Sequence, residues 1–262
     1  MDPIEPFVVM GMSETGKEVL DRAIQGVSDF LSIVCRPCCE ELGLMLRDKV
    51  REWRLNNVIK VIEKSQHKLS FEGGELNLRA NPRVALSIMD ECSIVDDDEL
   101  QNLWAGLFVS SCTADGKDDS NMNFVDLIRR MSSVEARILR YGCENCQKII
   151  YPNQLVLASD ITVPFDLLSN ITGTNDIYRL DAEMDHMRSI MLLNHGSAFE
   201  RGGGFFAGDG DLVADITPSA LGLSLYYKTH AFNCSPKEFW GASLITSKEY
   251  EAREKAKQED GQ

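Results

Sequence analysis

The chain has 262 residues, 44% of them hydrophobic and 26% charged, a composition typical of a globular protein with one large or two small domains. Its formal net charge of −14 excludes a protein that mainly grips the nucleic acid backbone, because such proteins need a basic footprint. The same charge weighs against general adhesion to anionic membranes, although a local patch could still bind either one.

The first residues carry no secretory signal, since MDPIEPFVVMGMSETGKE has neither a basic start nor an apolar core. We therefore expect a cytoplasmic protein of bacterial type, with its eight cysteines reduced rather than paired. The longest apolar stretch near this end, residues 23–39, contains Asp29 and is broken by Arg36 and Pro37. It is shorter than the roughly 20 apolar residues that a membrane-spanning helix needs.

Residues 1–12 are predicted to be a flexible leader, and residues 13–131 an all-helical domain. Thr15 and Glu18 fit a capping box, and apolar residues at helical spacing then predict an amphipathic helix to about residue 34. After Pro37 a long central helix is expected over residues 38–69, with Trp53 on its apolar side.

Two further helices of this domain have clear starts. Asn81 followed by Pro82 is a cap with proline at the first helical position. The acidic run Asp96–Glu99 suits the positive end of a helix dipole. The buried face of that second helix is predicted to contain Leu100, Leu103, Trp104, Leu107 and Phe108.

Residues 132–246 are predicted to form a winged-helix-like α+β domain. Ser132 and Glu135 fit a second capping box, and a helix over 133–143 is followed by an extended segment at 155–161. A short helix near 164–173, a longer one at 181–194, two strands joined by a glycine-rich turn and a closing helix at 216–230 complete the order. The charged tail, residues 247–262, reads as a solvated helix. The predicted fold class is thus mainly α: a helical bundle with a long central helix, then a winged-helix-like domain with a small β-hairpin.

The central helix is basic within an acidic chain. From Arg47 to Lys68 there are seven Lys or Arg and three Asp or Glu, whereas residues 90–119 hold nine acids and one lysine. Either the helix neutralises acids of its own fold, or it faces an anionic ligand or partner. We identify Arg51, Arg54, Asn57 and Lys64 as the candidate binding residues.

Asn57 is unusual in the middle of a helix, because asparagine competes for local backbone hydrogen bonds. It lies one turn after Trp53, and if buried it needs a partner. Arg54 or a backbone carbonyl of the next helix could supply that partner, which leaves a structural role and a recognition role both open.

The order of several motifs resembles the Abi-alpha (abortive infection alpha) family of bacterial proteins. The residues that carry the resemblance, within about 13–245, are Gly43, Trp53, Arg54, Asn57, Pro82, Arg83 and the acidic cap before Leu100–Trp104. The cysteine-rich segments CRPCCEE and GCENC depart from the family pattern. The resemblance implies phage defence through abortive infection, and it implies no known reaction.

Catalytic and metal chemistry find little support. Cys35/Cys38 and Cys143/Cys146 are both C-x-x-C pairs, but the 104 residues between them far exceed zinc-ribbon spacing. No metalloprotease, nucleophile-elbow or P-loop motif occurs, and the glycines near 202–210 fit a wing turn. We therefore predict no catalytic residue, no metal site and no cofactor.

The predicted partner is a protein or a second copy of the chain. Nucleic acid is disfavoured, because the helix at 181–194 brings three acids and one arginine to where a recognition helix meets DNA. The family resemblance implies an anti-phage protein, and the absence of a catalytic motif in the sequence favours action by contact rather than catalysis. The alternatives are a membrane-disrupting effector using helix 15–34, which contacts the bilayer without spanning it, and a winged-helix transcriptional regulator.

Overall fold

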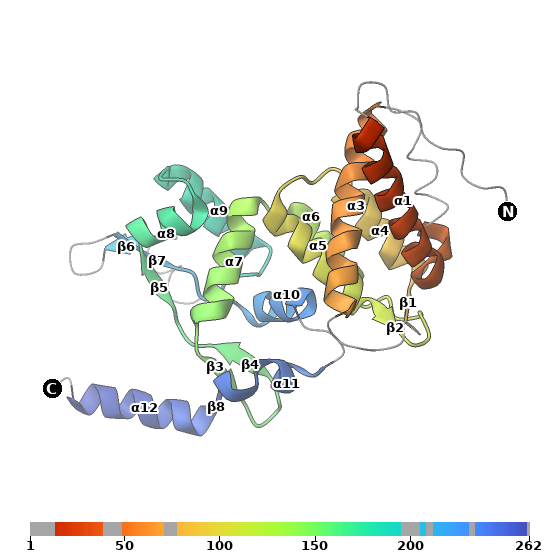
Figure 1. Cartoon of the computed structure of the whole chain (residues 1–262). Coiled ribbons are helices and arrows are strands. Elements are labelled where there is room, and N and C mark those ends of the chain that lie inside the picture. The colour runs from red at the N-terminus through yellow and green to blue at the C-terminus, as the bar shows by residue number, and fades with distance from the viewer. Residues whose placement is uncertain are drawn as a thin grey trace. The chain divides into compact units, whose positions relative to one another are not determined.

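The computed structural model describes residues 14–38, 49–70, 78–194, 205–207, 212–230 and 234–260, and these are mainly helical with small sheets (Figure 1). The chain divides into two compact units, Met1–Arg130 (unit 1) and Met131–Gln262 (unit 2), which are described separately. The predicted domain boundary is between residues 131 and 132. The predicted leader, residues 1–12, lies outside the described residues.

Unit 1 is built from helices and one two-stranded antiparallel sheet. Asn81 caps its third described helix by accepting a hydrogen bond from the backbone N–H of Arg83, and Asp97 caps the next by accepting from two N–H groups. Both helices thus start as their cap residues predict. The described elements are α1 (Glu14–Val34), α3 (Lys49–Ser70), β1 (Arg79–Ala80), α4 (Pro82–Cys92), α5 (Asp98–Ser110), β2 (Cys112–Thr113) and α6 (Met122–Arg130).

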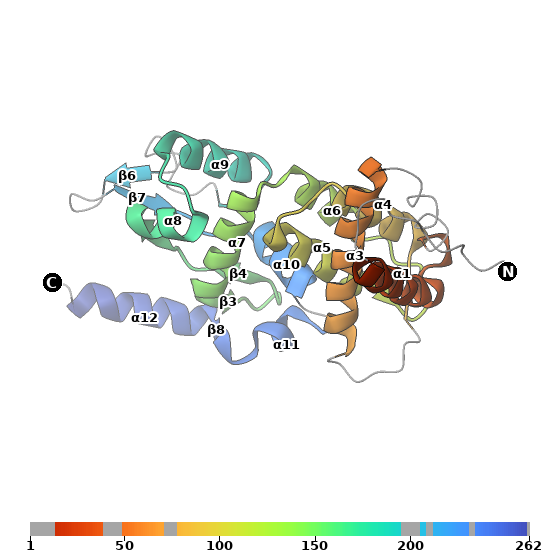
Figure 2. The ribbon, with the colours of Figure 1, turned by 45° about the horizontal axis from the view of Figure 1, so that its top comes forward.

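The core of unit 1 lies where α3 packs against α5 and α1 (Figures 1 and 2). Trp104 and Phe108 are fully buried, as predicted. The predicted apolar side of the central helix is wrong at Trp53, whose side chain is 44% exposed. The periodicity of this helix also placed Val58, Val61 and Ile62 on its apolar side, and these three are buried together with Leu55 and Ile59, because α1 and α5 pack on that side. The predicted start of this helix, at residue 38, falls where the structure leaves residues 39–48 undescribed.

Unit 2 contains two three-stranded sheets and several helices. One sheet has the order β4-β3-β8, with β3 and β8 parallel, and the other has the order β5-β7-β6, entirely antiparallel. The elements are α7 (Ser133–Asn145), β3 (Lys148–Ile150), β4 (Val156–Ala158), β5 (Thr162–Pro164), α8 (Phe165–Thr172), α9 (Ile177–Ser189), β6 (Phe205–Ala207), β7 (Leu212–Asp215), α10 (Ala220–His230), α11 (Pro236–Trp240), the 3₁₀ turn η1 (Gly241–Ser243), β8 (Leu244–Thr246) and α12 (Ser247–Asp260).

Helix α9 begins and ends earlier in the chain than predicted, at Ile177 and Ser189 rather than at residues 181 and 194. It begins at Ile177 because the Asp176 carboxylate accepts from the backbone N–H groups of Tyr178 and Arg179. It ends at Ser189, and Met191 then takes a positive φ of 62°, which leaves the helical region. The predicted helix over 181–194 therefore started too late and ran too far. The strand β3 and its partner β8 were not predicted.

The expectation of reduced cysteines is wrong at one pair, because Cys35 and Cys38 form a disulfide at the end of α1. Their Cα atoms lie 5.4 Å apart, within the range that a disulfide bridges. This turn brings two buried sulfur atoms together while Arg36 and Pro37 between them stay exposed.

Among the helices that the structure describes, none combines the length and the apolar character needed to cross a membrane.

Candidate functional site on helix α3

Arg54 connects helix α3 to the C-terminal end of α4. Its guanidinium donates to Asp90 Oδ1 at 2.6 Å and to Ser93 Oγ at 2.8 Å. The Arg54 side chain is 32% exposed and that of Asp90 is 73% exposed. Such a pair contributes at most about 1 kcal/mol, so its main effect is to fix where α3 meets the end of α4.

Asn57, one turn further along α3, is buried and satisfied. Its Nδ2 donates to the backbone carbonyl of Ser93 at 2.9 Å, and both residues are almost fully buried. Ser93 thus receives side-chain hydrogen bonds from two neighbouring positions of α3, Arg54 and Asn57. Ser93 caps the C-terminal end of α4. A backbone carbonyl of this next helix was one of the two partners predicted for the Asn57 amide.

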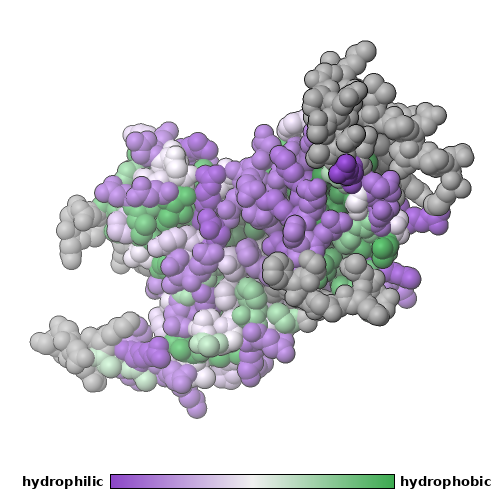
Figure 3. All heavy atoms as spheres, in the orientation of Figure 1, coloured by the Kyte–Doolittle hydropathy of each residue, from purple (hydrophilic) through white to green (hydrophobic). Residues whose placement is uncertain are grey.

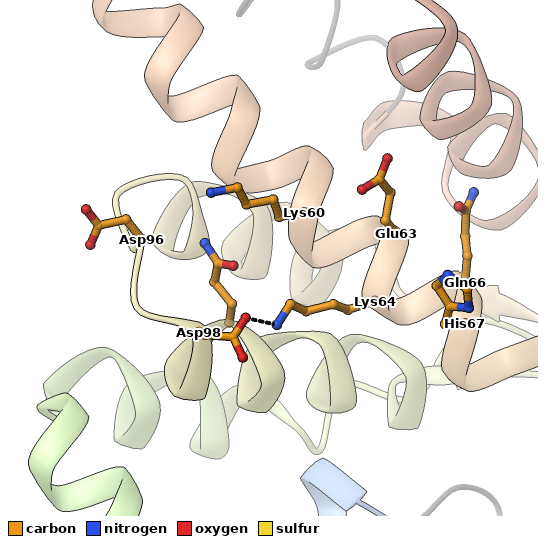
Figure 4. A pocket seen from close by; sticks show the side chains of 8 residues that line it. Lys60, Glu63, Lys64, Gln66, His67, Asp96 and Asp98 are labelled. Atoms are coloured by element: carbon orange, nitrogen blue, oxygen red, sulfur yellow. Dashed lines mark hydrogen bonds and ion pairs between the residues drawn. The ribbon is translucent and has the colours of Figure 1, made fainter. Parts of the chain in front are cut away.

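Lys64 anchors α3 to the first turn of α5. Its Nζ donates to Asp98 Oδ1 at 2.5 Å (Figure 4), and it also donates to Asn102 Oδ1 at 2.8 Å. This hydrogen bond and the positive charge of Lys64 lower the pKa of the Asp98 carboxyl. Further along α3, burial and then the nearby charge of Lys64 lower the pKa of Lys68. The basic helix therefore meets acid of its own unit at both Arg54 and Lys64, as internal neutralisation predicts.

An open cavity of about 790 Å³ lies along this part of α3. Figure 4 shows that its walls come from α3 on one side and from the α4–α5 loop with the start of α5 on the other. It is lined by Lys60, Glu63, Lys64, Gln66, His67, Asp96, Asp98 and Gln101, and we call it the α3–α5 groove. Side chains of both charge signs line it, so a ligand with only one kind of charge would meet repulsion as well as attraction.

Three charged side chains of the α3–α5 groove have no ion pair or hydrogen bond within the part of the chain that the structure describes: Lys60, Glu63 and Asp96. In Figure 4, Lys60 and Asp96 lie at the same end of the groove, on opposite walls. The Lys64–Asp98 pair connects the two walls, and the charge of Lys60 also contributes to the lowered pKa of the Asp98 carboxyl.

Exposed apolar residues flank the Arg54–Ser93 contact. Trp53 precedes Arg54 and is 44% exposed, and Ile94 follows Ser93 and is 57% exposed. Neither residue was predicted to lie at the surface, and periodicity had placed Trp53 on the apolar side of the helix.

A family model described as abortive infection alpha matches residues 54–202. The chain belongs to this abortive infection alpha family. Comparisons with curated proteins and with solved structures gave no match. Three of the four predicted site residues, Arg54, Asn57 and Lys64, fall within the matched range. Arg51 precedes it, and its side chain is outside the described part of the structure.

A second polar cluster lies in unit 2 and connects α7 to α9. The fully buried Glu135 lies 2.6 Å from His186 Nδ1 through one carboxylate oxygen, and its other oxygen accepts from the backbone N–H of Ser132. Burial raises the pKa of Glu135. The Ser132 hydroxyl accepts from the backbone N–H of Glu135, which completes the predicted capping box. The same hydroxyl donates to Glu183, which links the box to α9.

The buried cysteines among the described residues that lie outside the disulfide are poor nucleophiles. Burial raises the pKa values of Cys143 and Cys146, and it raises that of Cys112 to about 12. Thiols with raised pKa values are protonated at neutral pH and react slowly. Within the described ranges no cluster of three or more His, Cys, Asp or Glu side chains is arranged to hold a metal ion.

Proposed function

We propose that this chain is a cytoplasmic anti-phage protein that acts in abortive infection by binding a protein partner through the α3–α5 groove, without catalysing a reaction. Family membership supports the defence role. The observation that carries the contact role is the composition of the groove, in which Lys64 and Asp98 pair internally while Lys60, Glu63 and Asp96 do not.

Protein interfaces favour this combination of residues. Hot spots are enriched in Trp and Arg, and a polar rim around them supplies hydrogen bonds and charge complementarity. Trp53 and Arg54 lie outside the groove, about two turns before Lys60 on the same helix. Trp53 is half-exposed, and Arg54 is held in place by Asp90 and Ser93. A side chain fixed before binding loses less entropy when the partner arrives.

Unit 2 is, in this proposal, a winged-helix-like domain that serves as a second scaffold for protein contact. The order α7, β5, α8, α9, β6, β7 and the sheet order β5-β7-β6 support it. A DNA-reading role is less well supported, because Asp176, Asp181 and Asp185 accompany Arg179 on and before α9 and would repel phosphate.

A membrane effector is also less well supported. The apolar side of α1 packs into unit 1, where Val27 and Leu31 are buried and the Phe30 ring lies 6.3 Å from that of Phe108. Insertion would first require this helix to leave the core.

The test is phage plating on bacteria that express the protein. The double charge swap Lys60→Glu with Asp96→Lys, and separately Trp53→Ala, should abolish protection while the purified variants keep their circular dichroism spectra. Both changes affect surface positions, so the fold should tolerate them. Wild type should lower plating efficiency.

The matched control is the swap Lys248→Glu with Glu251→Lys on α12, which also exchanges two exposed charges and should leave protection intact. If the folded variant with Lys60→Glu and Asp96→Lys protects as well as wild type, the groove is not the contact site. If wild type itself gives no protection against a broad phage panel, the defence role fails.

A further inference from the structure

Helix α1 ends in a turn that a disulfide closes. Cys35 and Cys38 are bridged, with their Cα atoms 5.4 Å apart. The backbone N–H of Cys38 donates to the Cys35 carbonyl at 3.0 Å, and that of Cys35 donates to the Leu31 carbonyl at 2.8 Å. We call residues 35–38 the Cys35–Cys38 turn. Because these hydrogen bonds do not involve sulfur, they keep the two cysteines close together whether or not the sulfur atoms are bonded.

The Cys35–Cys38 turn is fastened to the core of unit 1. Cys38 is completely buried and Cys35 is 3% exposed. Leu31 and Val34, in the last turn of α1, are buried as well, and α1 packs against α3 and β1 (Figure 1). The bridge therefore ties a buried residue that follows α1 to a buried position at the helix end.

The outer side of the turn faces solvent. Arg36 and Pro37, the two residues between the cysteines, are exposed. Hydrophilic side chains are prominent on the described surface of unit 1 in Figure 3, and a water-soluble protein can approach such a surface. Only a local opening of the turn, rather than the unfolding of α1, is needed to bring the sulfur atoms to the surface.

The spacing of the cysteines does not by itself produce the bridge. Cys143 and Cys146 have the same C-x-x-C spacing at the end of α7, yet both are buried and neither forms a disulfide. Cys143 lies within α7 and Cys146 caps it, whereas Cys35 and Cys38 both follow the last residue of α1. The described residues thus contain one bridged and one unbridged pair.

A disulfide is unusual in the compartment that the proposed function gives this protein. Thiols are kept reduced in the cytoplasm, and the disulfides that do form there are typically transient and redox-sensing. A ring closed by residues of one turn also re-forms readily after reduction, because the entropy lost on closing a loop is smaller when the loop is short.

We infer that the Cys35–Cys38 disulfide is a reversible redox switch: a protein dithiol of the thioredoxin class opens it, and the opened turn loosens the end of α1 from unit 1. The inference rests on the proposed function for the cytoplasmic location alone, and it does not depend on the α3–α5 groove.

The exchange takes two balanced steps. A thiolate of the reductant attacks Sγ of one cysteine and forms a mixed disulfide, while the bond between the two protein sulfur atoms breaks and the second cysteine leaves as a thiolate that takes up a proton. The other thiol of the reductant loses its proton and attacks the reductant sulfur of the mixed disulfide, so the first cysteine also leaves and is protonated. The reductant becomes an intramolecular disulfide, and two electrons and two protons pass to the cysteine pair.

The experiment equilibrates the full chain with mixtures of reduced and oxidised dithiothreitol, the dithiol probe, at a series of ratios. Samples are quenched with acid, unfolded and alkylated, and mass spectrometry of the peptide that holds both cysteines gives the bridged fraction. We expect a single two-electron transition that is the same when approached from the reduced and from the oxidised side. Amide hydrogens in the last turn of α1 should exchange about tenfold faster in the reduced protein than in the oxidised one.

Two double variants serve as controls. Cys35→Ser with Cys38→Ser cannot form the bridge, so its α1 exchange should be as fast as that of reduced wild type under both conditions. Cys143→Ser with Cys146→Ser removes the other C-x-x-C pair and should respond to dithiothreitol as wild type does. The comparison of reduced with oxidised wild type needs no substitution, so it decides the question if a variant does not fold.

Three results would overturn the inference: free thiols at both positions under every ratio, a bridge that dithiothreitol reduces only after unfolding in urea, or equal α1 exchange in reduced and oxidised wild type. A redox response that persists in the variant with Cys35→Ser and Cys38→Ser would assign the switch to other cysteines and overturn it too. Phage protection is not measured in this experiment, so failure of the switch and failure of the proposed function are distinguishable.

Discussion

Replacing Asn57 by alanine tests what holds α3 in place. The substitution removes the hydrogen bond from Asn57 Nδ2 to the Ser93 carbonyl and leaves that buried oxygen without its partner. An unsatisfied buried acceptor costs about 1–3 kcal/mol. Alanine recovers roughly 0.5 kcal/mol through its better helix propensity. The expected loss in the free energy of unfolding is therefore about 1–2 kcal/mol.

The comparison variant is Lys64→Met, which keeps most of the apolar stem and removes the ion pair with Asp98. Because the Asp98 side chain is 82% exposed, water and salt screen this pair, and the loss should stay below about 1 kcal/mol. Loss of the buried amide hydrogen bond should thus lower the free energy of unfolding more than loss of the shorter, charged contact does.

Urea unfolding followed by tryptophan fluorescence measures both losses. A Trp240→Phe background restricts the emission to Trp53 and Trp104 of unit 1, and each variant is compared with that background. If Lys64→Met lowers the free energy of unfolding more than Asn57→Ala does, the surface ion pairs rather than the buried amide hold α3 in position. That result would refute the reasoning. A higher salt concentration provides a check, because it should reduce the loss caused by Lys64→Met and leave the loss caused by Asn57→Ala unchanged.

Gly222→Ala should lower the free energy of unfolding of unit 2 by about 2 kcal/mol or more, although alanine is the better helix former. An added Cβ would lie 2.3 Å from the Leu192 carbonyl oxygen, and thermal unfolding measures the loss; a stabilised variant would contradict the packing argument. Burial raises the pKa of Glu135 above its ordinary value of 4.5, so its contribution to folding is present in full below pH 4.5 and is lost as pH rises through the raised pKa. Wild type should accordingly lose stability relative to Glu135→Gln over that pH range, and an advantage of wild type that grows with pH would show that the His186 contact outweighs burial. Finally, iodoacetamide should modify Cys234 well before Cys143, whose pKa burial raises, and peptide mass mapping over time gives the order.

Local signals in the sequence determined the starts of α4, α5 and α7. Asn81 before proline, the acidic run before α5 and the Ser132–Glu135 capping box each begin a helix where predicted. These signals work because a cap satisfies backbone N–H groups of its own first turn and needs no distant partner. Where a nearer cap was overlooked, as with Asp176 before α9, the predicted start was wrong by a whole turn.

Long-range pairings could not be predicted in this way. The parallel strands β3 and β8 pair residues such as Lys148 and Leu244, which lie far apart in the sequence. Each strand has only three residues, which is too short for a hydrophobic period to predict it. The disulfide between Cys35 and Cys38 depends on how the end of α1 turns. Composition and compartment arguments had favoured reduced thiols.

The candidate site on α3 was likewise predictable only in part from the sequence. The sequence alone determined that a basic helix sits in an acidic chain and that Asn57 within it needs a partner. Only the tertiary structure decided which carboxylates meet Arg54 and Lys64, that Ser93 satisfies Asn57, and that Trp53 faces solvent. The reason is physical: periodicity shows that a helix has two sides, whereas the helices packed around α3 determine which side is buried.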